Sequence, residues 1–316
     1  MKTLSSLDKN GVDTISQIVY NLLKPNRLVT HAIERSNDMV SPYLTEVQQK
    51  EWQTEGFLLI KNVLSPTEID TLLTAVDSTI ETYVQETPNL QGNNRFGKGA
   101  YTIIRAIERT DALDPLTDHP RLFGTILSMM GPYLHIMGTQ IYVRHPDAEA
   151  LMAFHTDAGP SLQRIHPHPD SLPLQFKIQF FLTDLTEPNQ GNFMCVPGSH
   201  KVPFPENSFK KGTYPEGAIQ VLAEAGDAVI FPWALWHGVG PNQTERIRKS
   251  VTFRYGQMWS RPYDYDRLPA EVLARMTPRR RRLFGDMGED HHPTDYFKPH
   301  DQLEVIGADE WNVPLP

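Results

Sequence analysis

The tripeptide His155-Thr156-Asp157 carries two side chains that bind transition metals, and it follows a short apolar run. Side chains two residues apart on a strand point to the same face, so we expect the imidazole and the carboxylate to project together from the strand end. Two histidines and one carboxylate form the triad typical of non-haem Fe(II) enzymes, which leaves coordination positions open for chemistry. His155 and Asp157 would supply two of these three ligands.

Two other His-x-Asp pairs occur, beginning at His145 and His168, and each has proline in the middle. Proline cannot donate to the hydrogen-bond ladder of a sheet and favours turns. We therefore prefer His155, which follows an uninterrupted apolar run. The alternative is that His155 and Asp157 only form a hydrogen bond at the end of a strand.

The candidate third ligand is His237. Gly226 and Asp227 predict a turn, and the apolar run 228–231 predicts a buried strand. His237 then precedes Gly238, where backbone can pass close to a bound group. The chain between His155 and His237 is long enough for several strands to bring the two histidines together.

Arg248 follows His237 by eleven residues and shares one face of a β-rich run with Ser250. A planar guanidinium suits bidentate binding of a carboxylate, and a neighbouring hydroxyl adds a donor. A dicarboxylate that chelates a metal at one end needs such a partner at the other. The alternative is an ordinary surface arginine, because several basic residues crowd this segment.

Four segments together resemble the phytanoyl-CoA dioxygenase family of Fe(II)/2-oxoglutarate oxygenases. They are His155-Thr-Asp157, the segment 189–201 with its Val-Pro-Gly-Ser-His-Lys end, the segment 237–242, and Arg248-Lys-Ser250. The resemblance extends over about residues 50 to 257. It implies a double-stranded β-helix, or jelly-roll, which is a mainly β fold with flanking helices (α+β).

The resemblance also implies the cofactors and the reaction. Fe(II) would be held by His155, Asp157 and His237, and Arg248 with Ser250 would bind the distal carboxylate of 2-oxoglutarate. With O2 as the third reactant, the enzyme would hydroxylate an unactivated C–H bond of a small metabolite and release succinate and CO2. Desaturation, cyclisation or demethylation would use the same residues. Related halogenases replace the carboxylate ligand, so Asp157 favours hydroxylase-type chemistry.

Inward positions on other predicted strands supply further candidates. The family often has tryptophan on the strand after the His-x-Asp loop, and Gln179 takes that place here. We expect Gln179 and Gln140 to contact 2-oxoglutarate. Arg105, Tyr142 and Trp233 are candidates for binding the substrate, with a surface salt bridge as the alternative for Arg105. This mixture favours a small polar or amphipathic substrate over a long acyl-CoA.

Helix signals flank the predicted sheet. Thr45 and Gly56 predict the two ends of one helix, and Ser65-Pro-Thr-Glu68 is a capping box that opens another. We expect three segments, namely an N-terminal helical extension (1–42), the oxygenase domain (43–260) and a C-terminal extension packed on the core (261–316). The cationic run 279–282 is predicted to be a solvated face balanced by carboxylates.

Composition limits the possible partners. The net charge of −8 argues against a nucleic-acid-binding protein. The single cysteine, Cys195, excludes an intrachain disulfide and favours either a reducing compartment, which we expect to be the cytoplasm, or indifference to redox state. The chain has no signal-like or membrane-spanning apolar run. We expect a small-molecule substrate, no membrane partner, and a monomer or homodimer.

Two other functions are compatible with parts of this pattern. A cupin-like metal enzyme that does not use 2-oxoglutarate, such as a Zn(II) hydrolase, would keep the triad but would not need Arg248. A non-catalytic small-molecule binder could use the same jelly-roll without any need for His155.

Overall fold

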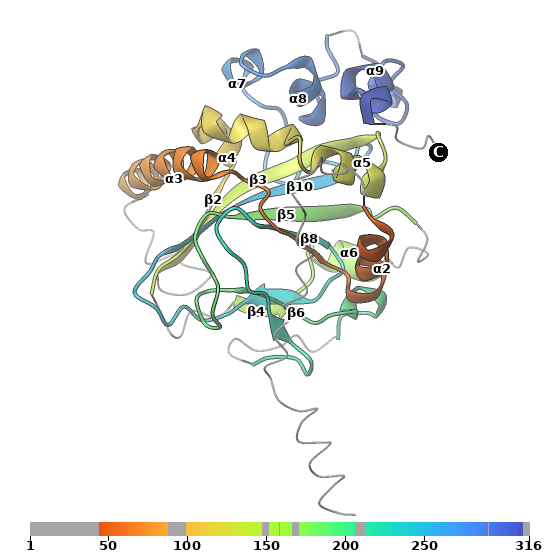
Figure 1. Ribbon diagram of the computed structural model, residues 1–316. Helices are drawn as coiled ribbons and strands as arrows, with labels where there is room; N and C mark the ends of the chain where they lie inside the picture. Colours follow the sequence, from red (N-terminus) through yellow and green to blue (C-terminus); the bar gives the residue numbers. More distant parts are fainter. Residues whose placement is uncertain are drawn as a thin grey trace, which may run out of the picture.

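The protein is described by a computed structural model that covers residues 44–87, 99–146, 152–157, 159–165, 171–205, 213–289 and 291–311. Two antiparallel sheets face each other (Figure 1). The larger sheet has the order β1 (Leu58–Ile60), β8 (Ala228–Pro232), β5 (Gln175–Phe181), β10 (Arg248–Gln257), β3 (Leu134–Arg144) and β2 (Ala100–Ile104). The smaller sheet has the order β4 (Met152–His155), β9 (His237–Val239), β6 (Phe193–Cys195) and β7 (Ile219–Gln220).

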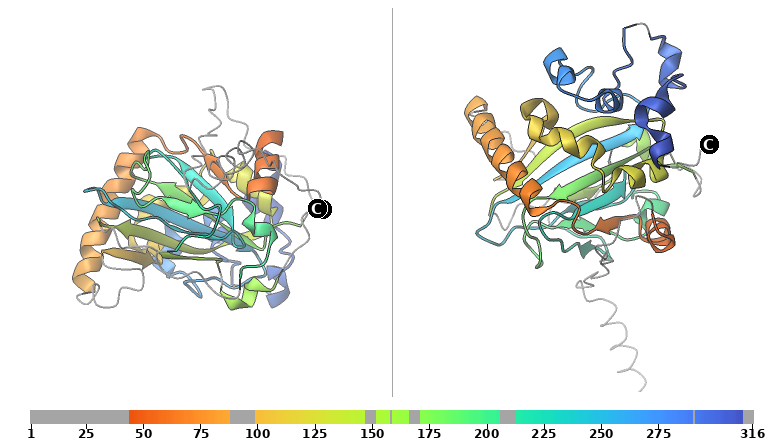
Figure 2. Two further views of the ribbon diagram at one scale, coloured as in Figure 1. Left: turned by 90° about the horizontal axis from the view of Figure 1, so that it is seen from below. Right: turned by 45° about the horizontal axis from the view of Figure 1, so that its top comes forward.

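Helices cover the outer face of the larger sheet (Figure 1). They are α3 (Pro66–Glu86), α4 (Ala106–Arg109), η1 (Asp111–Asp118) and α5 (Phe123–Met130), followed later by α7 (Ala270–Ala274), α8 (Pro278–Leu283) and α9 (Gln302–Ile306). Figure 2 shows that the last three lie beyond the outer face of this sheet. The remaining short elements are α2 (Glu46–Glu55), α6 (Pro160–Gln163), η2 (Ser199–Lys201), η3 (Pro293–Tyr296) and η4 (Ala308–Trp311).

The two predicted helix starts are confirmed. The Thr45 side chain accepts from the backbone N–H of Gln48, and α2 ends at Gly56, which has a positive φ of 78°. Ser65 and Glu68 form the reciprocal capping box of α3. These caps fix the residue at which each helix begins.

Strand β10 shows how the larger sheet separates its two faces. Val251, Phe253 and Tyr255 belong to the main hydrophobic core, which the sheet shares with the covering helices. The intervening residues Arg248, Ser250, Thr252 and Arg254 point to the inner face, and all four are buried. The same alternation on β5 places Lys177 and Gln179 on the inner face. A polar inner surface is thus built into the middle of the sheet.

The cationic run 279–282 differs in part from its prediction. Each arginine has a carboxylate partner, as predicted, and the partners are Glu310, Asp118, Asp286 and Asp301 in that order. The prediction of a solvated face is wrong for Arg282, whose side chain is 7% exposed because it extends from α8 to Asp301 and Gln302 at the start of α9. The run ties the C-terminal helices together. The division of the chain into three segments stays a prediction, and residues 1–42 lie outside the described part.

No helix in the described part of the chain combines the length and the apolar character that crossing a bilayer requires.

Candidate active site

The two histidines predicted to bind metal meet between β4 and β9. His155 ends β4 and His237 begins β9, and they are direct cross-strand partners with ring centroids 4.3 Å apart. Asp157 lies two residues beyond the end of β4, and its backbone N–H donates to the carbonyl oxygen of Trp233 at 2.9 Å. One ligand atom from each of His155, Asp157 and His237 lies within 4.8 Å of the others.

Both imidazoles are held in the form that binds a metal. Nδ1 of His155 lies 3.0 Å from the carbonyl oxygen of Ala153, and Nδ1 of His237 lies 2.8 Å from that of Leu235. A carbonyl oxygen only accepts, so each Nδ1 carries the proton and each Nε2 is left unprotonated and able to bind a metal. Burial lowers the pKa of His237 to about 3 and also lowers the pKa of His155, which keeps both rings neutral.

Asp157 is ionised and held by two cations. Its Oδ1 accepts hydrogen bonds from Lys177 Nζ at 2.8 Å and from Arg254 Nη2 at 3.0 Å. Its Oδ2 lies 3.9 Å from Nε2 of His237. Burial alone would raise the pKa of Asp157, but the charges of Arg254 and Lys177 hold it well below its usual range.

A small cavity of about 40 Å³ is lined in part by His155 and His237, two of the three candidate metal ligands. Its walls include Tyr142, His155, Lys177, Gln179, Phe193, Phe231, His237, Arg248 and Thr252. Gln179 donates to the hydroxyl of Ser250 at 3.0 Å, directly beside this wall. The predicted inward orientation of Gln179 and Tyr142 is therefore present in the structure.

Arg248 is buried at this cavity with an unsatisfied donor. Its Nε has no hydrogen-bond partner, and neither does Oγ1 of Thr252. Burial and the charge of Arg144, its cross-strand partner on β3, lower the pKa of Arg248 to about 9. A buried donor without a partner is costly, so this cavity is suited to an anion that accepts from Arg248.

The donor sets fit the two groups that the sequence pattern implied. Two neutral imidazoles and one carboxylate are a donor set for a divalent iron-type metal, and three ligands from the protein leave open positions. The unpartnered Nε of Arg248 and the unpartnered hydroxyl of Thr252 suit one end of a dicarboxylate.

Arg105 does not point into the cavity, so this prediction is wrong. Its side chain is 45% exposed and pairs with Glu108 at 2.6 Å. β2 ends at Ile104, and Arg105 has a left-handed backbone with a φ of 55°, which interrupts the strand alternation on which the prediction depended. The surface salt bridge is the correct alternative.

Gln140 and Trp233 bond to residues of the site but do not line the cavity. Gln140 is buried, and its side-chain oxygen accepts a hydrogen bond from the hydroxyl of Tyr142. Trp233 is also buried, and its carbonyl accepts from Asp157. Neither side chain belongs to the cavity wall, so their predicted contacts with 2-oxoglutarate and with substrate have no direct support.

Lys177, Thr252 and Arg254 were missed by the sequence reasoning, although they share a face with predicted residues. Thr252 and Arg254 continue the two-residue spacing of Arg248 and Ser250 along β10, and Lys177 precedes Gln179 by two on β5. Extending each spacing along its strand would have found all three.

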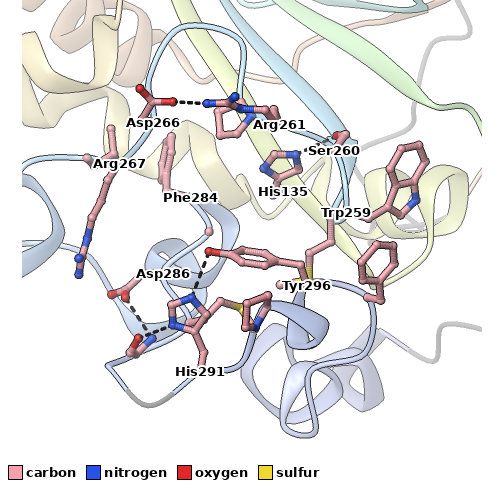
Figure 3. Close-up of a pocket in the computed structure, with 18 of the residues that line it drawn as sticks. His135, Trp259, Ser260, Arg261, Asp266, Arg267, Phe284, Asp286, His291 and Tyr296 are labelled. Carbon is pink, nitrogen blue, oxygen red and sulfur yellow. Dashed lines mark hydrogen bonds and ion pairs between the residues drawn. The ribbon is translucent and has the colours of Figure 1, made fainter.

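A larger cavity of about 470 Å³ lies elsewhere, between the segment that follows β10 and the C-terminal helices (Figure 3). Several of its polar residues pair with each other. Arg261 pairs with Asp266 at 2.8 Å, and His135 lies 3.1 Å from the hydroxyl of Ser260. Among the described residues, the single group suited to a metal is His155, Asp157 and His237, so the smaller cavity is the candidate active site.

Comparison with known families identifies the chain. The model of the phytanoyl-CoA dioxygenase family matches residues 52–250, well over half of the sequence. The chain belongs to this family. The resemblance noted in the sequence is confirmed, and so is the enzyme class that it implied, a non-haem iron and 2-oxoglutarate-dependent oxygenase.

Curated relatives of this dioxygenase include fungal and animal enzymes. It is 26% identical to Dioxygenase ALT11 of Alternaria alternata, covering 67% of this chain and 71% of the relative. It is 24% identical to Dioxygenase trt7 of Aspergillus terreus, covering 87% and 96%. It is 23% identical to the peroxisomal phytanoyl-CoA dioxygenase of Rattus norvegicus, covering 66% and 67%.

Solved structures show the same fold. HygX from Streptomyces hygroscopicus, with nickel and 2-oxoglutarate bound, matches with a TM-score of 0.54 and 22% identity, over 73% of this chain and 94% of HygX. SnoK, an alpha-ketoglutarate-dependent carbocyclase from nogalamycin biosynthesis, matches with a TM-score of 0.56 and 19% identity, over 77% and 94%. The predicted jelly-roll with flanking helices is confirmed.

Proposed function

We propose that His155, Asp157 and His237 bind Fe(II) in this dioxygenase, each through one atom. The observation that carries this proposal is the meeting of their three ligand atoms within 4.8 Å. The fixed protonation of the two imidazoles, with Nε2 left free on each, supports it. Three ligands from the protein leave positions for the co-substrate and O2.

We infer that Arg248 binds the distal carboxylate of 2-oxoglutarate. The unpartnered, buried Nε of Arg248 supports this role, as does the unpartnered hydroxyl of Thr252 beside it. Ser250 and Gln179 already bond to each other and can offer a further donor to the same carboxylate. The buried walls exclude water around this end of the co-substrate, which strengthens the charged contact.

With Fe(II) and 2-oxoglutarate bound, O2 would be the oxidant: one of its oxygen atoms would enter succinate as CO2 leaves, and the other would be available to oxidise a C–H bond of the substrate. The residues of the chain then have three tasks, which are to hold the metal, to orient the co-substrate through Arg248, and to position one C–H bond. No proton transfer by a side chain is needed. This agrees with a cavity whose histidines are both neutral and committed as ligands.

The substrate that we propose is a small polar or amphipathic metabolite, and the reaction is hydroxylation or a related C–H oxidation. Tyr142, fixed by Gln140, presents an aromatic ring at the cavity wall. We further propose that the enzyme acts as a monomer or homodimer in the cytoplasm. The buried free thiol of Cys195, the single cysteine of the chain, agrees with a reducing compartment.

An anaerobic titration tests the proposed site. Fe(II) and then 2-oxoglutarate are added to metal-free protein, and the weak visible charge-transfer band of the iron–2-oxoglutarate chelate is recorded. We expect the band in the wild type and its loss in His155→Ala. Iron binding without any band would refute the role of Arg248 and favour a cupin-like metal enzyme that does not use 2-oxoglutarate.

A further inference from the structure

Lys177 and Arg254 form a like-charged pair on the inner face of the larger sheet. They are direct cross-strand partners on β5 and β10. Their side chains are only 8% and 6% exposed, so solvent screens their repulsion poorly. Like charges in this relation destabilise a sheet unless an anion lies between them. Asp157 is the carboxylate that both of them contact.

Both contacts fall on one oxygen of Asp157. Oδ1 accepts from Lys177 Nζ at 2.8 Å and from Arg254 Nη2 at 3.0 Å. A carboxylate oxygen offers about two lone pairs, so these two donors use both directions. Oδ2 is the atom that lies 3.9 Å from Nε2 of His237. Oδ1 of Asp157 therefore faces the two cations, and Oδ2 faces the histidines.

The two cations are themselves held in place. Nη1 of Arg254 donates to the side-chain oxygen of Gln175 at 3.1 Å, and its guanidinium carbon lies 4.4 Å from the ring centroid of Tyr263. Nζ of Lys177 lies 5.9 Å from the ring centroid of Phe231. Turning the carboxylate of Asp157 away from its cations would break two buried, charge-assisted hydrogen bonds. Its orientation is thus fixed by the protein itself.

We propose that Lys177 and Arg254 are positioning residues that restrict Asp157 to a single metal-binding oxygen. This inference rests on the proposed function, because it explains how a coordination position is kept for the co-substrate. A carboxylate that bound through both oxygens would take a fourth position from the protein side. Chelating 2-oxoglutarate and O2 together require three, which is the number that single-oxygen binding leaves.

Arg254→Met and Lys177→Met in the full chain test this proposal with Co(II), whose ligand-field absorption depends on its coordination number. Each variant frees Oδ1 from one donor and removes one charge that repels the metal. We expect Co(II) to bind about tenfold more tightly, with a changed absorption spectrum before any 2-oxoglutarate is added. We also expect 2-oxoglutarate to bind the Co(II)-loaded variants about tenfold more weakly than the wild type.

Lys249→Met is the matched control. Lys249 lies on β10, as Arg254 does, but on the opposite face of the strand, where it pairs with Asp77 of α3. This control should leave the Co(II) spectrum and both affinities unchanged. If Arg254→Met does not fold, Lys177→Met alone carries the test, because it removes a donor to the same oxygen.

Opposite changes in metal and co-substrate affinity are the signature of the proposed role. Weaker Co(II) binding with an unchanged spectrum in both variants would overturn it, because that result indicates only structural support of the site. A wild type that binds Co(II) but not 2-oxoglutarate would instead refute the proposed function. The comparison of Co(II) spectra between variants would still decide the role of Lys177 and Arg254.

Discussion

His155 and His237 are direct cross-strand partners, and each donates its Nδ1 proton to the carbonyl two residues earlier in the chain. The pairing of β4 with β9 therefore sets the distance between the two Nε2 atoms, and the local backbone sets the protonation of each ring.

Metal binding should stabilise the fold, because the three ligands come from segments that are separated when the chain unfolds. At a free Mn(II) or Fe(II) concentration about 100 times Kd, we expect the free energy of unfolding to rise by about 2.7 kcal/mol. His237→Ala should abolish the rise, and a chelator should reverse it in the wild type. Thermal unfolding measures the effect, with His300→Ala at an exposed position as the control. An equal rise in His237→Ala would contradict the assignment of this ligand.

Replacing Arg248 with Met should weaken 2-oxoglutarate binding far more than metal binding. Loss of a buried charged partner costs about 2–5 kcal/mol, which corresponds to at least about a thirtyfold rise in the Kd for 2-oxoglutarate. Ser250→Ala should cost about 1 kcal/mol, since a single neutral hydrogen bond is lost. Calorimetric titration of each ligand separates the two affinities. Equal weakening of metal and 2-oxoglutarate binding in Arg248→Met would exclude the proposed role.

Acid should destabilise the metal-free protein through His135. Burial lowers the pKa of His135 to about 4, whereas the unfolded residue titrates near 6.5. The unfolded chain therefore takes up a proton below pH 6.5 that the folded chain does not, and stability falls as the pH drops toward 4. We expect His135 to contribute about 2 kcal/mol of this loss between pH 7 and pH 5.

The measurement is the difference in denaturant midpoint between the two pH values, compared with His135→Gln. The variant should lose about 2 kcal/mol less than the wild type over this range. His300→Gln, at an exposed position, is the control and should behave as the wild type does. The same pH dependence in His135→Gln and the wild type would show that His135 is not held neutral by burial.

The capping box of α3 gives a prediction about the fold alone. Ser65→Ala removes the hydroxyl that accepts from the backbone of Glu68, and it should lower the free energy of unfolding by about 1 kcal/mol. Thr67→Ala, one residue before Glu68 in the same first turn, is the control and should change it little. Urea unfolding compares the two. A loss in Thr67→Ala as large as that in Ser65→Ala would mean that the cap does not anchor this helix.

Local signals predicted the parts of this site that depend on spacing. The positions of His155 and Asp157 follow from strand alternation, and the helix starts at Thr45 and Ser65 follow from capping chemistry. The role of Arg248 was predicted from the chemistry of the ligand, because a dicarboxylate that chelates a metal at one end needs a cationic partner at the other. Each of these inferences uses residues that are close in sequence or a chemical requirement of the ligand.

The remaining features depend on strand register, which spacing alone does not give. The pairing of Lys177 with Arg254 depends on β5 and β10 lying side by side, and the sequence contains no signal that sets their offset. The prediction for Arg105 was wrong because it extended the strand alternation one residue past the end of β2. Gln140 was predicted on the correct face of its strand, but its side-chain oxygen accepts a hydrogen bond from the hydroxyl of Tyr142.

The hydrogen bonds from His155 to Ala153 and from His237 to Leu235 are contained within three-residue stretches of the chain. The backbone supplies both acceptors, so no side chain elsewhere in the molecule is needed to select the imidazole tautomer. Wall residues such as Tyr142, Gln179 and Phe231 are therefore free to change size and polarity without altering that selection. This independence lets one metal centre be kept while the space around it is reshaped, so substrate range can diverge without re-evolving the chemistry.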